Sequence, residues 1–220
     1  MTIERTQQKM DNIQVIAFDC DGVMFDTTNA NMAYYNEILK HLGRPSLTPE
    51  QFAYCHSHTA DQSIAHLFDD EQGFKKAQRY RKSMSYIPFL KYMVLEPYLK
   101  PILEALRPRY KTAIATNRSD TMDQVLSVHH LEGYFDLVVS SMDVDRPKPY
   151  PDPLIKILEY FEINANSALY VGDSELDQMA AKAAGVPFVA YQNKSLDADF
   201  HIGSLKEMAS ILDIEIPSPV

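Results

Sequence analysis

The sequence predicts an α/β protein, in which a parallel sheet carries helices on both faces and an all-helical segment is inserted after the first strand. Short apolar runs rich in β-branched residues alternate with segments of helical periodicity, which is typical of right-handed βαβ units. The first run, Ile13 to Phe18, is followed instead by residues 27–94, which hold several helical patterns and no convincing strand. We therefore expect a core domain of residues 1–26 and 95–220 and a helical domain of residues 27–94.

The first predicted strand ends on two acids. Ile13 to Phe18 is nearly continuously apolar, as in a strand buried on both faces. Asp19 and Asp21 follow it, and Gly22 turns the chain. Open α/β sheets bind ligands at the carboxyl ends of their strands, so this pair of acids predicts a ligand site. An EF-hand calcium loop does not fit, because the glycine comes too early and the twelfth position lacks Glu.

The inserted segment is predicted to be helical throughout. A helix is expected over 29–42, and Gly43 ends it. Thr48 to Gln51 forms a capping box with proline at the first helical position. Further helices are expected from Thr59 to about Phe68 and from Phe74 to about Leu90.

After the insert, the alternation of strands and helices resumes. Strands are predicted at 111–115, 135–139, 168–171 and 187–191. Helices are predicted over the apolar face of 99–106 and after the capping residues Ser119, Asp152, Ser174 and Ser204.

Polar side chains follow several of these strands. Because parallel strands share a direction, their carboxyl ends meet at one edge of the sheet. That edge would receive Asp19 and Asp21, Thr116 and Asn117, and Asp173 and Asp177. Lys148 lies in a loop stiffened by four prolines between Arg146 and Pro153, which helps to hold a lysine in place.

Composition limits the class of protein. The chain has 220 residues, of which 45% are apolar, so it can build a sizeable core. The formal net charge of −9 argues against nonspecific nucleic-acid binding. Apolar runs fall short of the length of a membrane helix, and two cysteines make no disulfide framework. From the polar first residues we expect no signal peptide. We expect a cytoplasmic protein, monomeric or weakly dimeric, that binds neither nucleic acid nor membranes.

The sequence resembles the haloacid dehalogenase superfamily, in its phosphatase branch with a helical C1-type cap. The resemblance rests on four segments in order: Asp19-Cys20-Asp21-Gly22, Ala115-Thr116-Asn117, Lys148-Pro149-Tyr150-Pro151-Asp152-Pro153 and Gly172-Asp173-Ser174-Glu175-Leu176-Asp177. The phosphoglycolate phosphatase-like and β-phosphoglucomutase-like groups are the nearest in pattern. The resemblance implies a Rossmann-like core with an inserted helical cap.

The resemblance also implies roles for the acids. Asp19 would be the nucleophile and form an aspartyl-phosphate, and Asp21 would act first as general acid and then as general base. Mg²⁺ would offset the repulsion between carboxylate and phosphate. Asp19, Asp173 and the backbone carbonyl of Asp21 would hold the ion. Asp177 would either contact the metal or orient its waters and Lys148.

The remaining expected contacts concern the phosphoryl group. By the same resemblance, Thr116, Asn117 and Lys148 would bind its oxygens. Ser119 is expected to cap the next helix, whose amino end would then point toward the site.

The helical cap holds further candidates. In capped relatives, a loop near Cys55 to Thr59 faces the core site and selects the substrate, so His56 and His58 are candidates for contacts with the leaving group. A metal site at these histidines lacks a supporting acid or cysteine cluster. Arg79, with Arg81 and Lys82, is a candidate for binding a second anionic group of the substrate.

These observations favour a Mg²⁺-dependent phosphatase acting on a small phosphorylated metabolite of the phosphoglycolate or sugar phosphate class. A phosphosugar mutase is the nearest alternative, because Val23 occurs among sugar-phosphate mutases and sugar phosphatases. Gly172-Asp173 favours hydrolysis, since the mutases tend to place Glu before that Asp. The other alternative is a non-catalytic binding protein on the same fold, against which the complete set of motif residues argues.

Overall fold

The chain forms two compact units. The computed structural model describes residues 12–57 and 60–217, without the side chains of residues 56 and 57. One unit comprises the chain up to Asp26 and from Leu95 onward, and the other comprises Thr27–Val94. A two-stranded sheet, β2 (Phe25–Asp26) with β3 (Val94–Leu95), lies where the chain passes from one unit to the other.

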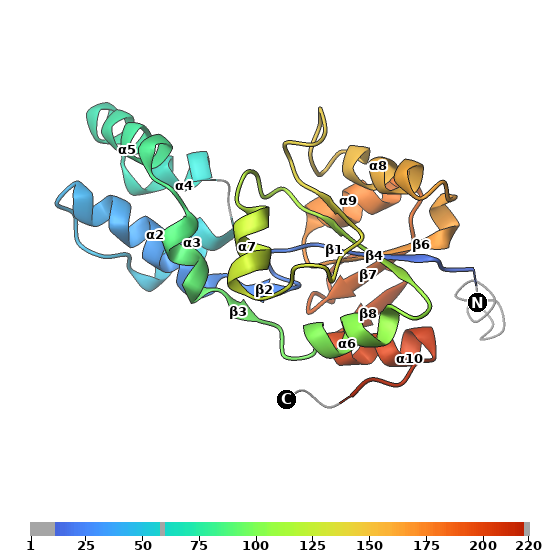
Figure 1. Cartoon of the computed structure of the whole chain (residues 1–220). Helices are drawn as coiled ribbons and strands as arrows, with labels where there is room; N and C mark the ends of the chain where they lie inside the picture. The colour runs from blue at the N-terminus through green and yellow to red at the C-terminus, as the bar shows by residue number, and fades with distance from the viewer. Residues whose placement is uncertain (1–11, 58–59, 218–220) are drawn as a thin grey trace. The chain divides into compact units, whose positions relative to one another are not determined.

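The first unit is built on a parallel sheet in the order β5-β4-β1-β6-β7-β8 (Figure 1). Its strands are β1 (Val15–Phe18), β4 (Lys111–Ala115), β5 (Leu137–Val139), β6 (Ala168–Gly172), β7 (Phe188–Tyr191) and β8 (Phe200–Ile202). Every residue of β1, β6 and β7 is buried, as expected for strands covered on both faces. The central position of β1 places its carboxyl end in the middle of the sheet edge.

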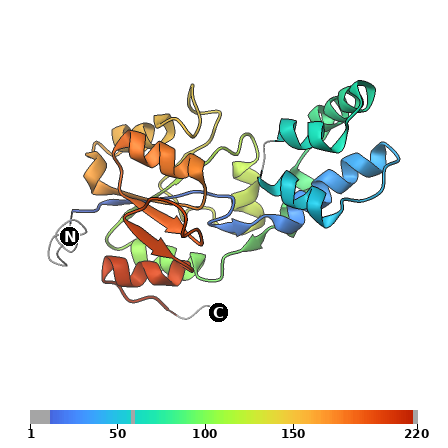
Figure 2. The ribbon, with the colours of Figure 1, turned by 180° about the vertical axis from the view of Figure 1, so that it is seen from behind.

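Helices cover both faces of this sheet. α8 (Asp152–Tyr160) and α9 (Glu175–Ala184) lie on one face, and α6 (Leu99–Leu106) and α10 (Met208–Leu212) lie on the other (Figures 1 and 2). Val15 and Ala17 of β1 pack in one apolar cluster with Leu154, Ile157 and Ala180. Since the side chains of a strand alternate between the two faces of the sheet, those of Ile16 and Phe18 point to the opposite face.

The connections complete this unit. α7 (Met122–Val128) follows β4, and the short 3₁₀ helices η2 (Ala165–Ser167) and η3 (Leu205–Glu207) precede β6 and α10. Among the described residues, each helix is too short or too polar to cross a bilayer.

The second unit is helical. It contains α2 (Thr28–His41), α3 (Pro49–Ser57), α4 (Ala60–Leu67), α5 (Glu71–Ser83) and the 3₁₀ helix η1 (Ile87–Tyr92). Its buried apolar cluster consists of Tyr35, Ile38, Leu39, Cys55, Ile64, Phe68 and Ala77. The predicted capping box forms, because the Thr48 amide bonds Gln51 Oε1 and the Gln51 amide bonds Thr48 Oγ1.

The predicted fold class is confirmed, with differences in individual elements. The helix expected over 74–90 is split into α5 and η1, because Pro88 sits at the start of η1 and cannot supply the N–H of a continuous helix. β8 was not predicted, because three residues at the sheet edge give too short a pattern. Thr121, not Ser119, is the residue at the N-cap of α7, and the Ser119 hydroxyl bonds Asp120 Oδ1.

Candidate active site

The sheet brings the predicted site segments together. β1 pairs in parallel with β4 and β6, so that Phe18 lies beside Ile114 on one side and Val171 on the other. The next residues along these strands therefore leave the sheet at the same edge. Asp19 is among them, and its backbone N–H donates to the carbonyl oxygen of Val171 at 2.8 Å.

Lys148 lies buried between two of the acids. Its ammonium donates to Asp19 Oδ1 and to Asp177 Oδ1, each at 2.6 Å. A third acceptor is the hydroxyl oxygen of Tyr170, at 3.0 Å. Burial disfavours the charged form, but Asp177 and Asp19 outweigh it and raise the pKa of Lys148. Lys148 is therefore a fixed positive charge throughout the neutral range.

The loop that carries Lys148 is fastened to the end of β4. The side-chain amide of Asn117 donates to the backbone carbonyl of Lys148 at 2.8 Å. Asn117 is otherwise exposed, whereas Thr116 is 1% exposed and its hydroxyl accepts from the Arg118 amide. The phosphoryl contacts expected of Thr116 and Asn117 stay predictions.

Asp177 joins the site to the start of α9. Ser174 is the N-cap, and Ser174 and Asp177 form a capping box. Oδ2 of Asp177 accepts from the backbone and the hydroxyl of Ser174, while Oδ1 accepts from Lys148 and from the Tyr170 hydroxyl at 2.7 Å. Burial would raise the pKa of this carboxyl, but Lys148 and these hydrogen bonds outweigh it, so the pKa lies below its usual value. Asp177 is thus a buried carboxylate that already has four donors.

Asp173 completes a cluster of acids with Asp19 and Asp177. Ligand atoms of the three carboxylates lie within 4.8 Å of one another. Burial, followed by the charge of Asp177, raises the pKa of Asp173 to about 7. Burial is also the main cause that raises the pKa of Asp19 well above its usual value. A nearby cation would favour the ionised form of these carboxyls.

A divalent metal fits this cluster. Carboxylate oxygens are the ligands that Mg²⁺ and other hard cations prefer. Asp19, Asp21, Asp173 and Asp177 outnumber the two cationic side chains that pair with them, Lys148 and Arg118. The acid cluster therefore carries an excess of negative charge that a divalent ion would balance.

Gly22 makes room for this cluster. Its φ of +91° is a conformation that favours glycine, and a Cβ built there would lie 2.2 Å from Asp173 Oδ2. The turn after β1 can therefore approach Asp173 only because residue 22 has no side chain.

Asp21 has a partner that the sequence analysis did not identify. Both of its carboxylate oxygens accept from the guanidinium of Arg118, with Nε to Oδ2 at 3.1 Å and Nη2 to Oδ1 in a shorter contact. The Arg118 side chain is 8% exposed and that of Asp21 38%. Asp21 is thus held in one orientation while it stays open to solvent.

Two important residues were missed for different reasons. Tyr170 lies in an apolar strand, where a tyrosine reads as a core residue. Arg118 directly follows the motif residues Thr116 and Asn117 at the end of a strand. Its charge at this position could have indicated that it belongs to the site.

The cap candidates are placed only in part. His56 lies in α3, its side chain is not described, and His58 is outside the described residues. Arg79 is exposed on α5 and lines a hollow in the helical unit with Lys75 and Lys82. Arg81 instead pairs with Asp61 at 2.5 Å.

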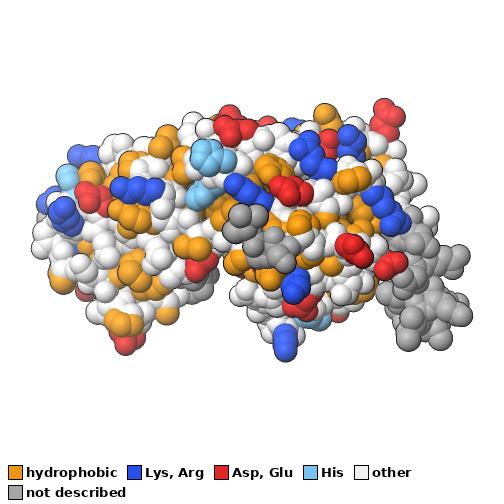
Figure 3. Space-filling view, turned by 60° about the horizontal axis from the view of Figure 1, so that its bottom comes forward, with side chains coloured by type: hydrophobic (Ala, Val, Ile, Leu, Met, Phe, Trp, Pro, Cys, Tyr) orange, Lys and Arg blue, Asp and Glu red, His pale blue; other side chains and the backbone are white. Residues whose placement is uncertain are grey.

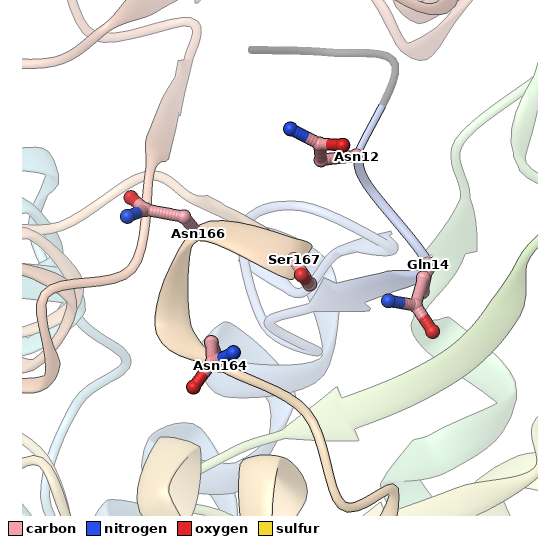
Figure 4. Close-up of a pocket in the computed structure, with 5 residues that line it drawn as sticks. All are labelled: Asn12, Gln14, Asn164, Asn166 and Ser167. Atoms are coloured by element: carbon pink, nitrogen blue, oxygen red, sulfur yellow. The ribbon is translucent and has the colours of Figure 1, made fainter.

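Another hollow lies at the opposite end of the strands (Figure 4). It measures about 640 Å³ and is lined by Asn12, Gln14, Asn164, Asn166 and Ser167. These residues offer amides and one hydroxyl, but neither a carboxylate nor an amine for acid–base or metal chemistry. We therefore assign the candidate active site to the carboxyl edge of the sheet.

Figure 3 shows how the charged side chains are distributed over one face of the molecule. There, the described Lys and Arg side chains are scattered among Asp and Glu side chains instead of gathering in one basic area. This distribution agrees with the net charge of −9.

The fold and the site define an α/β enzyme with carboxylates and a buried lysine at the carboxyl edge of a parallel sheet. The family model described as haloacid dehalogenase-like hydrolase matches residues 16–191. The chain belongs to this family, and the resemblance noted from its motifs is confirmed.

Individual relatives agree with this assignment. A phosphoglycolate phosphatase of Nitrosospira multiformis is 30% identical over 218 residues, covering 91% of this chain and 96% of that protein. A pyrophosphatase PpaX of Bacillus mycoides is 25% identical over 193 residues, covering 81% and 83%. A crystal structure of a HAD-superfamily hydrolase of subfamily IA, variant 1, from Geobacter sulfurreducens has a TM-score of 0.85 and 38% identity, covering 91% and 97%. The expectation of a hydrolase of the phosphatase type is thereby confirmed.

Proposed function

We propose that this protein is a Mg²⁺-dependent phosphatase that hydrolyses a small phosphorylated metabolite through an aspartyl-phosphate on Asp19. The observation that carries the proposal is the buried ammonium of Lys148, shared at 2.6 Å by Asp19 and Asp177, with Asp173 beside them. A buried nucleophilic carboxylate needs such positive charge before it can approach a phosphate anion.

The first half-reaction breaks the phosphate ester. Lys148 occupies Oδ1 of Asp19, so the other oxygen of that carboxylate attacks phosphorus. The bond from phosphorus to the leaving oxygen breaks, and Asp21 would pass a proton to that oxygen, which requires one of its oxygens to give up its hydrogen bond from Arg118. Asp21 suits this exchange because its side chain is 38% exposed, unlike buried Asp19.

The second half-reaction restores the enzyme. Asp21, now ionised, takes a proton from a water molecule that attacks the aspartyl-phosphate. Inorganic phosphate leaves, and Asp19 is again a carboxylate.

The hydrogen bonds of the acids indicate which of them would bind the metal ion. Asp177 already has four donors, so we assign it to holding Lys148. Asp19 and Asp173 would hold Mg²⁺ with the backbone carbonyl of Asp21. The bound ion would supply positive charge against the negative charge of nucleophile and phosphate.

The substrate class comes from the relatives. Because similar proteins include phosphoglycolate phosphatases and pyrophosphatases PpaX, we place the substrate among small phosphorylated acids and pyrophosphate, and the motif resemblance adds sugar phosphates to this group. We propose that the helical unit, Thr27–Val94, acts as the cap that chooses among them, with His56, His58 and Arg79 as its candidate contacts.

The test is phosphate release from this substrate panel with Mg²⁺. Asp19→Asn keeps the shape of the side chain but removes the nucleophile, so we expect turnover to disappear and acid-quenched wild-type protein to carry phosphate on Asp19. The exposed Asp197→Asn serves as matched control and should keep full activity. Turnover by Asp19→Asn would contradict the mechanism, and isomerised sugar phosphate without free phosphate would favour the mutase.

A further inference from the structure

We propose that Tyr170 is a positioning residue that fixes the ammonium of Lys148 against Asp19. This inference rests on the proposed function, because it concerns how the nucleophile of that reaction is kept in place. Tyr170 lies in β6, is 0% exposed, and therefore cannot contact a substrate from solvent.

The argument begins with the donors of Lys148. An ammonium group has three N–H bonds and no acceptor. Its three acceptors are Asp19 Oδ1, Asp177 Oδ1 and the Tyr170 hydroxyl oxygen, at 2.6, 2.6 and 3.0 Å. All three directions of the ammonium are thus taken by the protein, so the group cannot rotate or tilt without losing a bond.

The hydroxyl of Tyr170 is itself fixed. Its own proton goes to Asp177 Oδ1 at 2.7 Å, which is nearer than the other acceptor, the backbone carbonyl of Ala115 at 3.0 Å. The two lone pairs of the oxygen then remain for accepting, and Lys148 takes one of them. Tyr170 thereby ties Lys148 to β6 and, through its one proton, to the start of α9.

Removing this hydroxyl leaves the ammonium with two acceptors, both carboxylates. The third N–H would lie in a buried site without a partner, which is unfavourable. We expect the ammonium to shift toward a position that pairs it less well with Asp19. Its charge would then offset the charge of the nucleophile less well during attack, while the surface that binds substrate stays the same.

The experiment compares Tyr170→Phe with Tyr110→Phe. Tyr110 is a matched control, because it is 3% exposed and lies at the amino end of β4, away from the acids. We expect Tyr170→Phe to lower kcat about tenfold with KM changed less than about twofold, as fits loss of one hydrogen bond to a charged group. Tyr110→Phe should keep the wild-type kcat. A Tyr170→Phe kcat within about twofold of wild type would overturn the proposal.

A measurement without substrate separates this inference from the proposed function. In protein with isotope-labelled lysine, the hydrogen-bonded ammonium of Lys148 should give an NMR cross-peak between its protons and nitrogen, assigned by its absence in Lys148→Arg. We expect Tyr170→Phe to shift or broaden this peak through faster exchange with water, and Tyr110→Phe to leave it unchanged. An unchanged peak in Tyr170→Phe would refute this inference, whatever the activity of the wild-type protein. A wild-type protein that released no phosphate would refute the proposed function alone.

Discussion

Removing the buried cation should cost stability in a pH-dependent way. Lys148→Met takes away the ammonium that Asp19 and Asp177 share and leaves two carboxylates in a buried site. The side chain of Lys148 is 4% exposed and that of Asp177 0%, so water cannot replace the lost partner.

The magnitude follows from the geometry. Ligand oxygens of these two carboxylates lie within 4.8 Å, which at an effective dielectric constant of about 20 corresponds to a repulsion of roughly 3.5 kcal/mol. Breaking a buried ion pair by removing one partner typically costs about 3–5 kcal/mol. We therefore expect the free energy of unfolding to fall by about 3–5 kcal/mol at about pH 8.

The sign of the pH dependence follows from Asp19. Its pKa is already raised by burial and only partly lowered by Lys148, so the variant should hold a proton there to still higher pH. A carboxyl whose pKa is raised on folding destabilises the folded state as pH rises from the unfolded value to the folded one. The deficit of Lys148→Met relative to wild type should thus shrink near pH 5 and grow toward pH 8.

The assay is urea unfolding followed by circular dichroism at both pH values, with chelator present. Lys156→Met is the control, since Lys156 is 42% exposed, lies 3.9 Å from the Asp143 carboxylate and donates to the Asp143 backbone carbonyl at 2.6 Å, contacts that water can replace, so that its loss should cost less than about 1 kcal/mol. A Lys148→Met variant with wild-type stability at about pH 8, or with the same deficit at both pH values, would refute this reasoning.

Three further predictions concern neighbouring groups. Because the pKa of Asp173 is raised to about 7, protons should compete with Mg²⁺ for this carboxylate. The affinity for Mg²⁺, measured by calorimetry, should therefore decrease as the pH is lowered below about 7 and change little above it. Gly22→Ala should weaken Mg²⁺ binding by at least about tenfold, since its Cβ would meet Asp173, whereas Gly133→Ala, with φ of +74° and open space, should not. Arg118→Met should cost only about 1 kcal/mol in urea unfolding, because Asp21 can rehydrate; a loss comparable to that of Lys148→Met would contradict this.

The sequence predicted the central part of the site because its chemistry has local signatures. Asp19 follows a buried strand, Lys148 lies in a proline-rich loop, and Asp173 follows another strand, so strand direction alone brings them to one edge. The expected capping role of Ser174 was also correct, since it depends on residues only three positions apart.

The parts that were missed depend on contacts distant in sequence. Arg118 pairs with Asp21 across 97 positions, and Tyr170 reaches Lys148 across 22. Neither pairing has a periodicity or a spacing from which it can be inferred. The displaced cap of α7 has a different cause, because Ser119, Asp120 and Thr121 are all favourable capping residues, and their order along the chain does not decide among them.

The capping box of α9 has a consequence for local opening. Asp177 holds the first turn of this helix through Ser174 and the ammonium of Lys148 through its other oxygen. Fraying of that turn would therefore cost the buried lysine one of its three acceptors, although Asp19 and Tyr170 would still hold it, so this network should oppose opening of the helix end. The amides at the start of α9 should then exchange with deuterium as slowly as the central strands do, unlike the ends of most helices. The end of this helix is thus stabilised by the same ammonium that supplies the counter-charge of the nucleophile.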